Sequence, residues 1–248
     1  MSSQPTVILV PGAWTGAWVW EPTANELCRR GIEAEAVTLR GLETNLPRPA
    51  IAAVHLEDHV DQVAALVTRR TNPVVLVGHS YSSMVTAQVA DRVGAQVVGL
   101  VHFGGFMPED GRSLLDGWGD SASAREDERQ AIVDAGDVWL PPEPHMLEHE
   151  RDLTNADRTL LTERFTLHPG HTVTDPARLH TASSDQPTTY FTLSPEDIST
   201  ASRATDPDVP KAWRVEHLVS GHWPMLSRPD DVVDLIAREV VRYGEGQE

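Results

Sequence analysis

The sequence of 248 residues contains a single cysteine and is short of positive charge. One cysteine excludes an internal disulfide and fits a reducing compartment. We expect Cys28 to be a small buried hydrophobic residue rather than a reactive thiol. The 20 Lys and Arg face 37 Asp and Glu, which gives a formal net charge of −17. Such a charge repels phosphate backbones and anionic headgroups, so binding to nucleic acid or to a membrane surface is not expected.

The sequence also lacks any hydrophobic run near the ~18–20 residues that span a membrane. Its first five residues carry no Lys or Arg, and residues 6–10 are too short for the hydrophobic region of a signal peptide. The hydrophobic fraction of 40% and the seven Trp indicate a real core. We therefore expect a soluble cytoplasmic protein that acts on a small molecule. The composition does not exclude that the protein forms a homodimer.

Short hydrophobic runs alternate with helical patterns along the first part of the chain. This alternation predicts an α/β fold, a mainly parallel sheet with helices on both faces and active residues at the carboxyl ends of the strands. The expected strands are residues 7–10, 35–39, 74–77, 97–103, 188–193 and 212–219, and the expected helices are 20–30, 56–70, 82–92 and 230–242.

The alternation stops after Phe106 and returns at Thr188. Between them no stretch is convincing as a strand. Residues 109–163 hold 15 acidic residues and five Arg, a local net charge of 5 − 15 = −10, which is typical of a solvated helical surface. We predict a helical cap over residues 107–186, inserted after the strand that ends near Phe103 and lying over the strand ends. Residues 1–106 and 187–248 form the core.

The most informative segment is a hydrophobic strand that runs into Gly78-His79-Ser80-Tyr81-Ser82 and then into a helix. A tight strand-to-helix turn of the type Gly-x-Ser-x-small lifts a serine hydroxyl above the sheet, where it can act as a nucleophile. An ordinary serine cap at the start of a helix is the alternative interpretation.

A nucleophilic serine needs a base, and the chain offers 11 histidines. His79 lies inside the turn, and His102 and His217 lie within expected strands. His222 instead follows the last strand and precedes the last helix, so it should reach the same edge of the sheet as Ser80. We predict that His222 is the base.

The base needs an orienting acid, which in this architecture precedes the histidine in the chain. Asp197 is the preferred acid because it follows the strand 188–193, and the adjacent Glu196 is the alternative. The oxyanion formed during attack needs two backbone N–H donors. We expect them from Tyr81, next to the nucleophile, and from Ala13, in the loop after the first strand.

These segments resemble those of α/β-hydrolases in the plant methylesterase and hydroxynitrile lyase group and of their bacterial relatives. The similar segments are residues 10–20, 78–82, 106–111 and 221–222. The resemblance spans nearly the whole chain except the cap. It implies the α/β-hydrolase fold with a lid, and roles for Ser80, His222 and Asp197 as the catalytic triad.

The chain departs from that group at Pro11 and in the spacing around Glu196 and Asp197, which leaves the position of the acid open by one residue. Pro11 stands where the group usually has His, which changes how the oxyanion loop is held. The hydroxynitrile lyases have Thr in place of Gly12, and Lys, which holds the cyanide charge, in place of Trp223. The only lysine of this chain is Lys211. The resemblance therefore favours ester hydrolysis over lyase chemistry.

Two weaker patterns concern the substrate and metals. Hydrophobic cap residues, with Phe165 and Met146 among them, line a substrate pocket or hold the cap to the core. The predicted substrate-binding residues are Trp14, Met107, Trp118, Trp139 and Trp223. The pairs His145 with His149 and His168 with His171 have metal-ligand spacing, but flanking prolines favour cap surface. No metal and no cofactor are expected.

The sequence thus predicts a serine hydrolase that cleaves esters of a small, neutral, apolar or aromatic molecule. One alternative keeps the triad but performs C–C hydrolysis, elimination or rearrangement, because one fold hosts many chemistries. The other is a ligand-binding protein without catalysis. An acidic cap should disfavour anionic esters.

Overall fold

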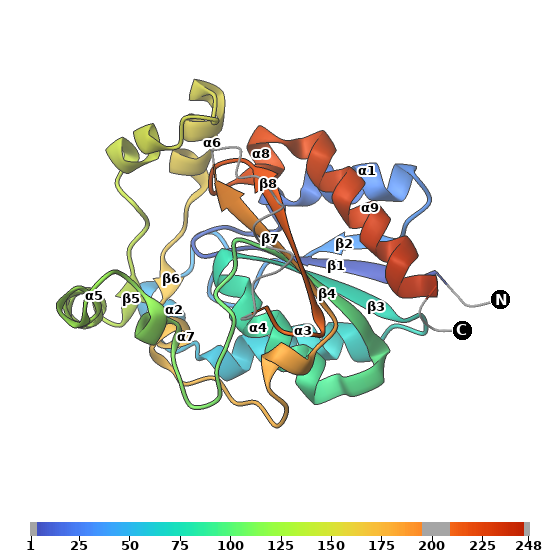
Figure 1. Cartoon of the computed structure of the whole chain (residues 1–248). Coiled ribbons are helices and arrows are strands. Elements are labelled where there is room, and N and C mark those ends of the chain that lie inside the picture. Colours follow the sequence, from blue (N-terminus) through green and yellow to red (C-terminus); the bar gives the residue numbers. More distant parts are fainter. Residues whose placement is uncertain (1–3, 195–208, 246–248) are drawn as a thin grey trace.

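A six-stranded sheet forms the centre of the molecule (Figure 1), in which every neighbouring pair of strands is parallel. The structure, a computed structural model, describes residues 4–194 and 209–245. The strand order is β2-β1-β3-β4-β7-β8. The strands are β1 (Thr6–Val10), β2 (Ala34–Ala36), β3 (Val74–His79), β4 (Val97–Phe103), β7 (Thr188–Ser194) and β8 (Trp213–Val219). The predicted parallel sheet is confirmed.

Helices cover both faces of the sheet (Figure 1). Those in contact on one face are α1 (Glu21–Arg29) and α9 (Pro229–Glu245), and those on the other are α3 (Leu56–Thr68) and α4 (Ser83–Val93). Side chains alternate along a strand, so neighbouring residues of β1 enter opposite cores. Ile8 and Val10 pack in the core with α3 and α4, whereas Val7 and Leu9 pack in the core with α1 and α9. A strand buried on both faces explains the continuous hydrophobic run.

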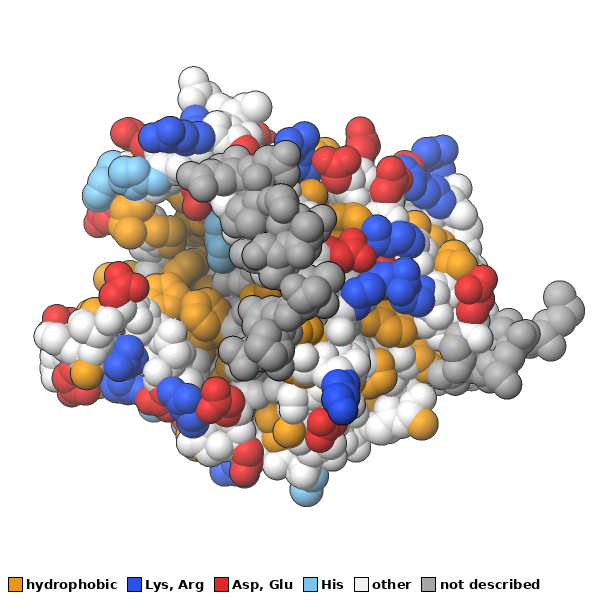
Figure 2. Space-filling model, viewed as in Figure 1, with side chains coloured by type: hydrophobic (Ala, Val, Ile, Leu, Met, Phe, Trp, Pro, Cys, Tyr) orange, Lys and Arg blue, Asp and Glu red, His pale blue; other side chains and the backbone are white. Residues whose placement is uncertain are grey.

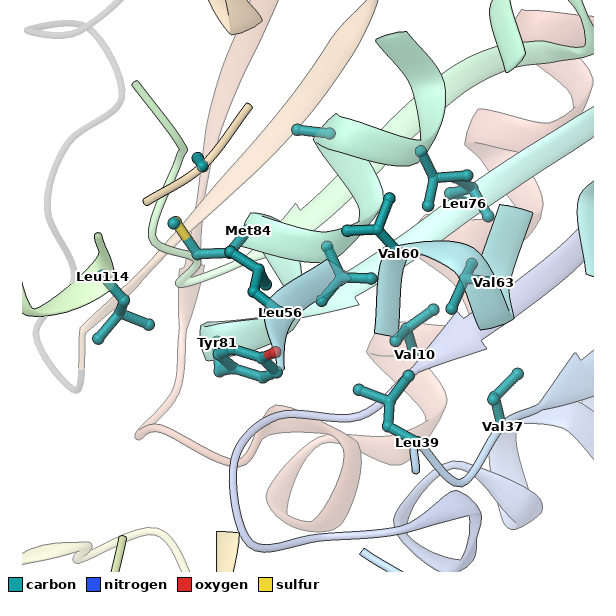
Figure 3. Packing of buried hydrophobic residues seen from close by; sticks show 14 of the residues in the cluster. Val10, Val37, Leu39, Leu56, Val60, Val63, Leu76, Tyr81, Met84 and Leu114 are labelled. Carbon is teal, nitrogen blue, oxygen red and sulfur yellow. The ribbon is translucent and has the colours of Figure 1, made fainter. Parts of the chain in front are cut away.

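The core beneath α3 supports the candidate nucleophile turn (Figure 3). Val60 and Val63 of α3 pack in one cluster with Leu76 of β3, and Tyr81 of the turn and Met84 of α4 belong to the same cluster. Burying a side chain of this size stabilises the fold by about 1.5–3 kcal/mol. The turn between β3 and α4 is therefore anchored in this core by residues of the turn itself and of the strand and helix that it joins.

Residues 107–186, which we call the cap segment, lie between β4 and β7 in the chain. Their longer helices are α5 (Ala122–Asp134) and α6 (Asn155–Arg164), and a short helix α7 (His171–Thr174) follows. β5 (Val138–Trp139) pairs antiparallel with β6 (His168–Pro169). The expectation of no strand here is wrong at this two-residue ladder. Figure 1 shows α5 and α6 on the side toward which the strand ends of β7 and β8 point.

Three further details differ from the expectations. β2 ends at Ala36, although Val37 and Leu39 beyond it are still buried. Two short helices, α2 (Arg48–Ala52) and α8 (Pro224–Ser227), were not predicted. Cys28 is exposed rather than buried, because it lies on the outer side of α1 near the end of the helix. Within residues 4–194 and 209–245, no helix has the length and hydrophobicity needed to cross a membrane.

Candidate active site

Ser80 lies at the turn between β3 and α4 in a backbone conformation that side chains rarely adopt. Its φ is 52°, in the left-handed region, and the short 3₁₀ helix η2 (Ser80–Ser82) begins with it. Gly78 lies two residues before it, where a side chain would fit only tightly. A Cβ at Gly78 would lie 3.0 Å from Thr86 Oγ1 and 3.1 Å from His102 Nδ1. This is the sharp strand-to-helix turn that the sequence pattern predicts.

The hydroxyl of Ser82 ties this turn to the neighbouring strand. Ser82 Oγ accepts the N–H of His79 at 2.8 Å and lies 2.8 Å from the carbonyl oxygen of Val10, to which it donates. The sequence pattern explains Ser82 only as a small residue. Its hydroxyl also joins the end of β1 to the turn, and Val10 leads directly into the predicted oxyanion loop.

His222 lies in the loop between β8 and α8, beside this turn. Its carbonyl oxygen accepts the Nε2–H of His79 at 2.7 Å, and the two imidazole rings are 4.8 Å apart between centroids. Burial lowers the pKa of His222 to about 4, so the ring is neutral near pH 7, as a general base must be. Among the described residues, Ser80 Oγ and the His222 ring share no hydrogen bond; His79 connects the two segments.

Two carboxylates of the cap segment hold the His222 loop. Asp152 Oδ2 accepts the N–H of Gly221 at 2.7 Å, and Glu150 Oε2 accepts the N–H of His222 at 2.8 Å. The sequence analysis missed both, since acidic residues are frequent throughout this segment and nothing local distinguishes these two. The cap segment thus contacts the backbone of the candidate base.

The predicted acid, Asp197, and its alternative, Glu196, lie outside the described residues. β7 pairs with β8 up to the register of Ser194 with Val219, so both strands end at the same level. The chain leaves β7 at the edge where His222 follows β8. The choice of acid stays a prediction.

The predicted oxyanion donors lie on the two loops that meet at this edge. Ala13 is buried in the loop after β1, and its N–H has no protein acceptor among the described residues. Tyr81 is anchored through its buried side chain. His59 Nε2 lies 2.6 Å from the carbonyl oxygen of Arg40 and therefore carries the proton, so His59 Nδ1 accepts the Tyr81 hydroxyl at 2.7 Å. Burial raises the pKa of Tyr81, so the hydroxyl stays protonated.

Four of the five predicted substrate-binding residues belong to one chain of aromatic contacts. Trp14 stacks obliquely on Trp139 with centroids 4.2 Å apart, and Trp139 meets Trp118 at 5.2 Å. At the other end Phe165 joins Trp14 to Trp223, with centroid distances of 6.3 Å and 6.1 Å. We call this series, which ends next to His222, the aromatic arc. Its members are Phe106, Trp118, Trp139, Trp14, Phe165 and Trp223.

Met107, the fifth, is half-buried beside the arc and packs against the core that contains Tyr81. Figure 2 shows hydrophobic side chains gathered in a hollow of this face, between the part of the cap segment with α6 and the part with α5. Phe106 was not singled out from the sequence as a substrate contact.

The structure does not bring the histidine pairs together as metal ligands. His145 and His149 are exposed, and His168 is buried while His171 stacks on His55. In the described part of the chain, the residues whose ligand atoms come within 4.8 Å of one another are His55, His171 and Asp175. His55 Nδ1 already bonds Asp175 at 2.9 Å, and its ring lies nearly parallel to His171 at 9°. The lone pairs of two stacked, parallel rings do not converge on one point, as metal ligands must. The contacts of this cluster instead hold the end of α7 against the start of α3.

Comparisons with known proteins agree with this architecture. The sequence model described as "Alpha/beta hydrolase family" matches residues 7–235. A carbendazim-hydrolysing esterase of Nocardioides sp. is 36% identical over 109 residues, which are 44% of this chain and 45% of that esterase. The matched part therefore spans less than half of that relative. A protein of Phoma sp. named as a hydrolase is 24% identical over 247 residues, 95% of this chain and 98% of that protein.

Solved structures extend the likeness to the whole fold. An extracellular α/β-hydrolase from a Paenibacillus species, described as sharing structural and functional homology with tobacco salicylic acid binding protein 2, superimposes with a TM-score of 0.76. The two are 18% identical, and the match covers 94% of this chain and 98% of the other. The predicted fold class is confirmed.

Proposed function

Because this chain belongs to the α/β-hydrolase family, we propose that it is a serine esterase in which Ser80 is the nucleophile and His222 the base. The single observation that carries the proposal is the conformation of Ser80. A non-glycine residue at a φ of 52° costs about 1 kcal/mol or more. Strain of this kind clusters at active sites, and here the loop of a neutral, half-buried His222 lies beside it.

In the proposed reaction, Ser80 Oγ bonds to the ester carbonyl carbon while His222 takes the hydroxyl proton. The carbonyl oxygen becomes negatively charged and accepts the N–H groups of Ala13 and Tyr81. Each such donor contributes about 2.7–4 kcal/mol to the transition state. The C–O bond to the alcohol then breaks, and His222 returns the proton to the leaving oxygen. In the second half, His222 takes a proton from water while the water oxygen bonds to the acyl carbon. The bond to Ser80 Oγ then breaks, and His222 returns the proton to Ser80 as the acid is released. Asp197 orients His222, and no cofactor takes part.

The substrate in this proposal is a small neutral ester with an apolar or aromatic part. The aromatic arc supports it, since flat rings bind flat apolar groups well. The excess of acidic residues in the cap segment supports a neutral or weakly cationic substrate over an anionic one. The match to an esterase named for hydrolysing carbendazim supports an ester-like substrate.

The test uses a fluorophosphonate probe and neutral p-nitrophenyl esters. We expect the probe to label the wild type but not Ser80→Ala. The rate of ester hydrolysis should fall at least 1,000-fold in Ser80→Ala, on the order expected for removal of a triad member. Ser83→Ala, three residues further and also buried, is the matched control and should keep both activities. Labelling that persists in Ser80→Ala refutes the assignment.

Two further comparisons test the finer parts of the proposal. Asp197→Asn and Glu196→Gln separate the two candidate acids, and we expect only the first to lose activity by orders of magnitude. Matched neutral and anionic esters at low salt test the role of the acidic cap segment. A preference for the neutral ester should fade with added salt, because exposed charges are screened beyond ~8–10 Å.

A further inference from the structure

Trp14, the residue after Ala13, is held by the cap segment through all three of its polar groups. Its N–H donates to His168 Nδ1 at 3.3 Å, its carbonyl oxygen accepts the N–H of Thr166 at 2.9 Å, and its indole Nε1–H donates to the carbonyl oxygen of Trp139 at 3.2 Å. Trp14 has a φ of 61°, so its backbone needs support from outside the loop. The loop begins with Pro11, which has neither an N–H nor a polar side chain to give that support.

Two hydrogen bonds, one at Gly12 and one at Trp14, fix the peptide groups on either side of Ala13. The carbonyl oxygen of Gly12 accepts the Thr15 hydroxyl at 3.1 Å. In a planar trans peptide the N–H points opposite to the carbonyl, so this bond directs the Ala13 N–H away from Thr15. The next peptide, between Ala13 and Trp14, is directed by the bond from Trp14 N–H to His168. The Ala13 N–H belongs to the first of these fixed peptides and adjoins the second, and it has no protein acceptor among the described residues.

His168 is suited to accept this N–H because its proton is fixed on the other ring nitrogen. The Thr172 hydroxyl donates to the carbonyl oxygen of Pro169 at 2.7 Å, so it accepts from His168 Nε2 at 2.9 Å. The proton therefore sits on Nε2, and the lone pair of Nδ1 faces Trp14. The His168 ring is fully buried and lies 4.6 Å from the Tyr81 ring, centroid to centroid. One histidine thus touches both loops that carry the predicted oxyanion donors.

We propose that His168 is a positioning residue for catalysis: from the cap segment it holds the Trp14 backbone and thereby aims the Ala13 N–H at the oxyanion. This rests on the proposed esterase function. The cap segment then completes the catalytic machinery rather than only covering it. His168 does not touch the reacting atoms, so its effect should appear in kcat and not in substrate binding.

The experiment compares wild type, Ser80→Ala, His168→Phe and His168→Asn with p-nitrophenyl butyrate and a trifluoromethyl ketone. Phe keeps the ring volume without an acceptor, whereas the Asn amide oxygen reaches about the position of Nδ1. The ketone forms a bond between Ser80 Oγ and its carbonyl carbon, which leaves an oxyanion like that of the transition state. We expect His168→Phe to lower kcat by about 10- to 100-fold with KM within about twofold. Ketone affinity should fall by the same factor, and His168→Asn should recover most of both.

Amide hydrogen exchange gives a readout that does not depend on activity. Peptides covering residues 12–16 should exchange faster in His168→Phe than in wild type or His168→Asn. Thr172→Val, which leaves Nε2 without its acceptor, provides a second variant if His168→Phe does not fold, and should lower kcat several-fold. Wild-type kcat, ketone affinity and exchange in a folded His168→Phe would overturn the inference while leaving the esterase intact. Hydrolysis that survives in Ser80→Ala would overturn the proposed esterase function. Amide exchange of residues 12–16 would then test by itself whether His168 holds the Trp14 backbone.

Discussion

The ring of His79 donates its Nε2–H to the carbonyl oxygen of His222 across 2.7 Å. Burial, with the neighbouring His222, lowers the pKa of His79 to about 3, so His79 is neutral near pH 7 and its single proton lies on Nε2. The residue before the candidate nucleophile therefore holds the loop that carries the candidate base. From the sequence alone, His79 is distinguished only by its place inside the turn.

Removing this donor should impair the proposed catalysis. We expect His79→Leu to lower kcat/KM for neutral esters by at least about 10-fold, because the His222 loop loses a buried hydrogen bond worth ~1 kcal/mol and its fixed position. In His79→Gln the side-chain amide reaches about the same donor position, so most activity should return. Steady-state kinetics of the two variants measure this, and equal activities would contradict it.

The strain at Ser80 predicts a gain in stability when glycine replaces it. Glycine adopts a positive φ without cost, whereas alanine keeps the strain of a side chain. Both variants lack the hydroxyl, so their difference reports the effect of a Cβ at this φ. Urea unfolding should give Ser80→Gly a free energy of unfolding about 1 kcal/mol higher than that of Ser80→Ala. Equal values would mean that the turn is not strained in solution.

Gly221 has no room for a side chain, because the cap carboxylates fill the space. A Cβ there would lie 2.2 Å from Asp152 Oδ1 and 2.4 Å from Glu150 Oε2. We expect Gly221→Ala to displace both acceptors and to lower ester hydrolysis by at least about 10-fold. Gly117→Ala is the control, since nothing lies within 4 Å of a Cβ at that cap position. If both variants hydrolyse the ester at the same rate, the cap carboxylates do not matter for the His222 loop.

Buried neutral histidines make the fold sensitive to acid. Burial lowers the pKa of five of them below the ordinary 6.5, so the unfolded chain takes up protons first as the pH falls. The free energy of unfolding should be full above pH 6.5 and fall by about 1.4 kcal/mol per pH unit for each group as the pH drops below 6.5 toward each folded value. These residues are His59, His79, His102, His168 and His222.

His102 offers the sharpest test of this pH dependence. Burial lowers its pKa to about 3, and neither ring nitrogen has a hydrogen-bond partner among the described residues. His102→Leu should therefore reduce the slope of unfolding free energy against pH, between pH 6 and 5, by about 1.4 kcal/mol per pH unit. Urea titrations at several pH values measure the slope. An unchanged slope would show that His102 is protonated in the folded state.

The sheet and the nucleophile turn could be predicted because their signals are local. A hydrophobic run between turn residues defines β3, and Gly78 and Ser82 flank Ser80 within five residues. The hydrolase prediction is confirmed at the level of the family. The short β5–β6 ladder pairs residues about 30 positions apart. Each of its strands has only two residues, which is too short to show the alternation of side chains that predicts a strand.

The contacts that hold the site had no local signal. His168 and Trp14 are 154 positions apart, and Asp152 and Gly221 are 69 apart. The only sequence signal at His168 is its spacing to His171. In the structure the two rings have different partners, since His168 bonds Trp14 and His171 stacks on His55. Cys28 was misjudged for a related reason: residue type predicts average burial, whereas the face of α1 on which a residue lies decides the actual burial.

The position of Cys28 has a practical consequence. α1 starts near the carboxyl edge of the sheet, after β1, and returns to the opposite edge, where Cys28 Sγ lies 3.5 Å from the carbonyl oxygen of Ala34 at the start of β2. The one thiol of the chain is thus exposed at the end of the molecule away from Ser80. A maleimide dye or a surface tether attached there leaves the hollow accessible. Oxidation of this thiol to a disulfide would link two copies at a point remote from Ser80.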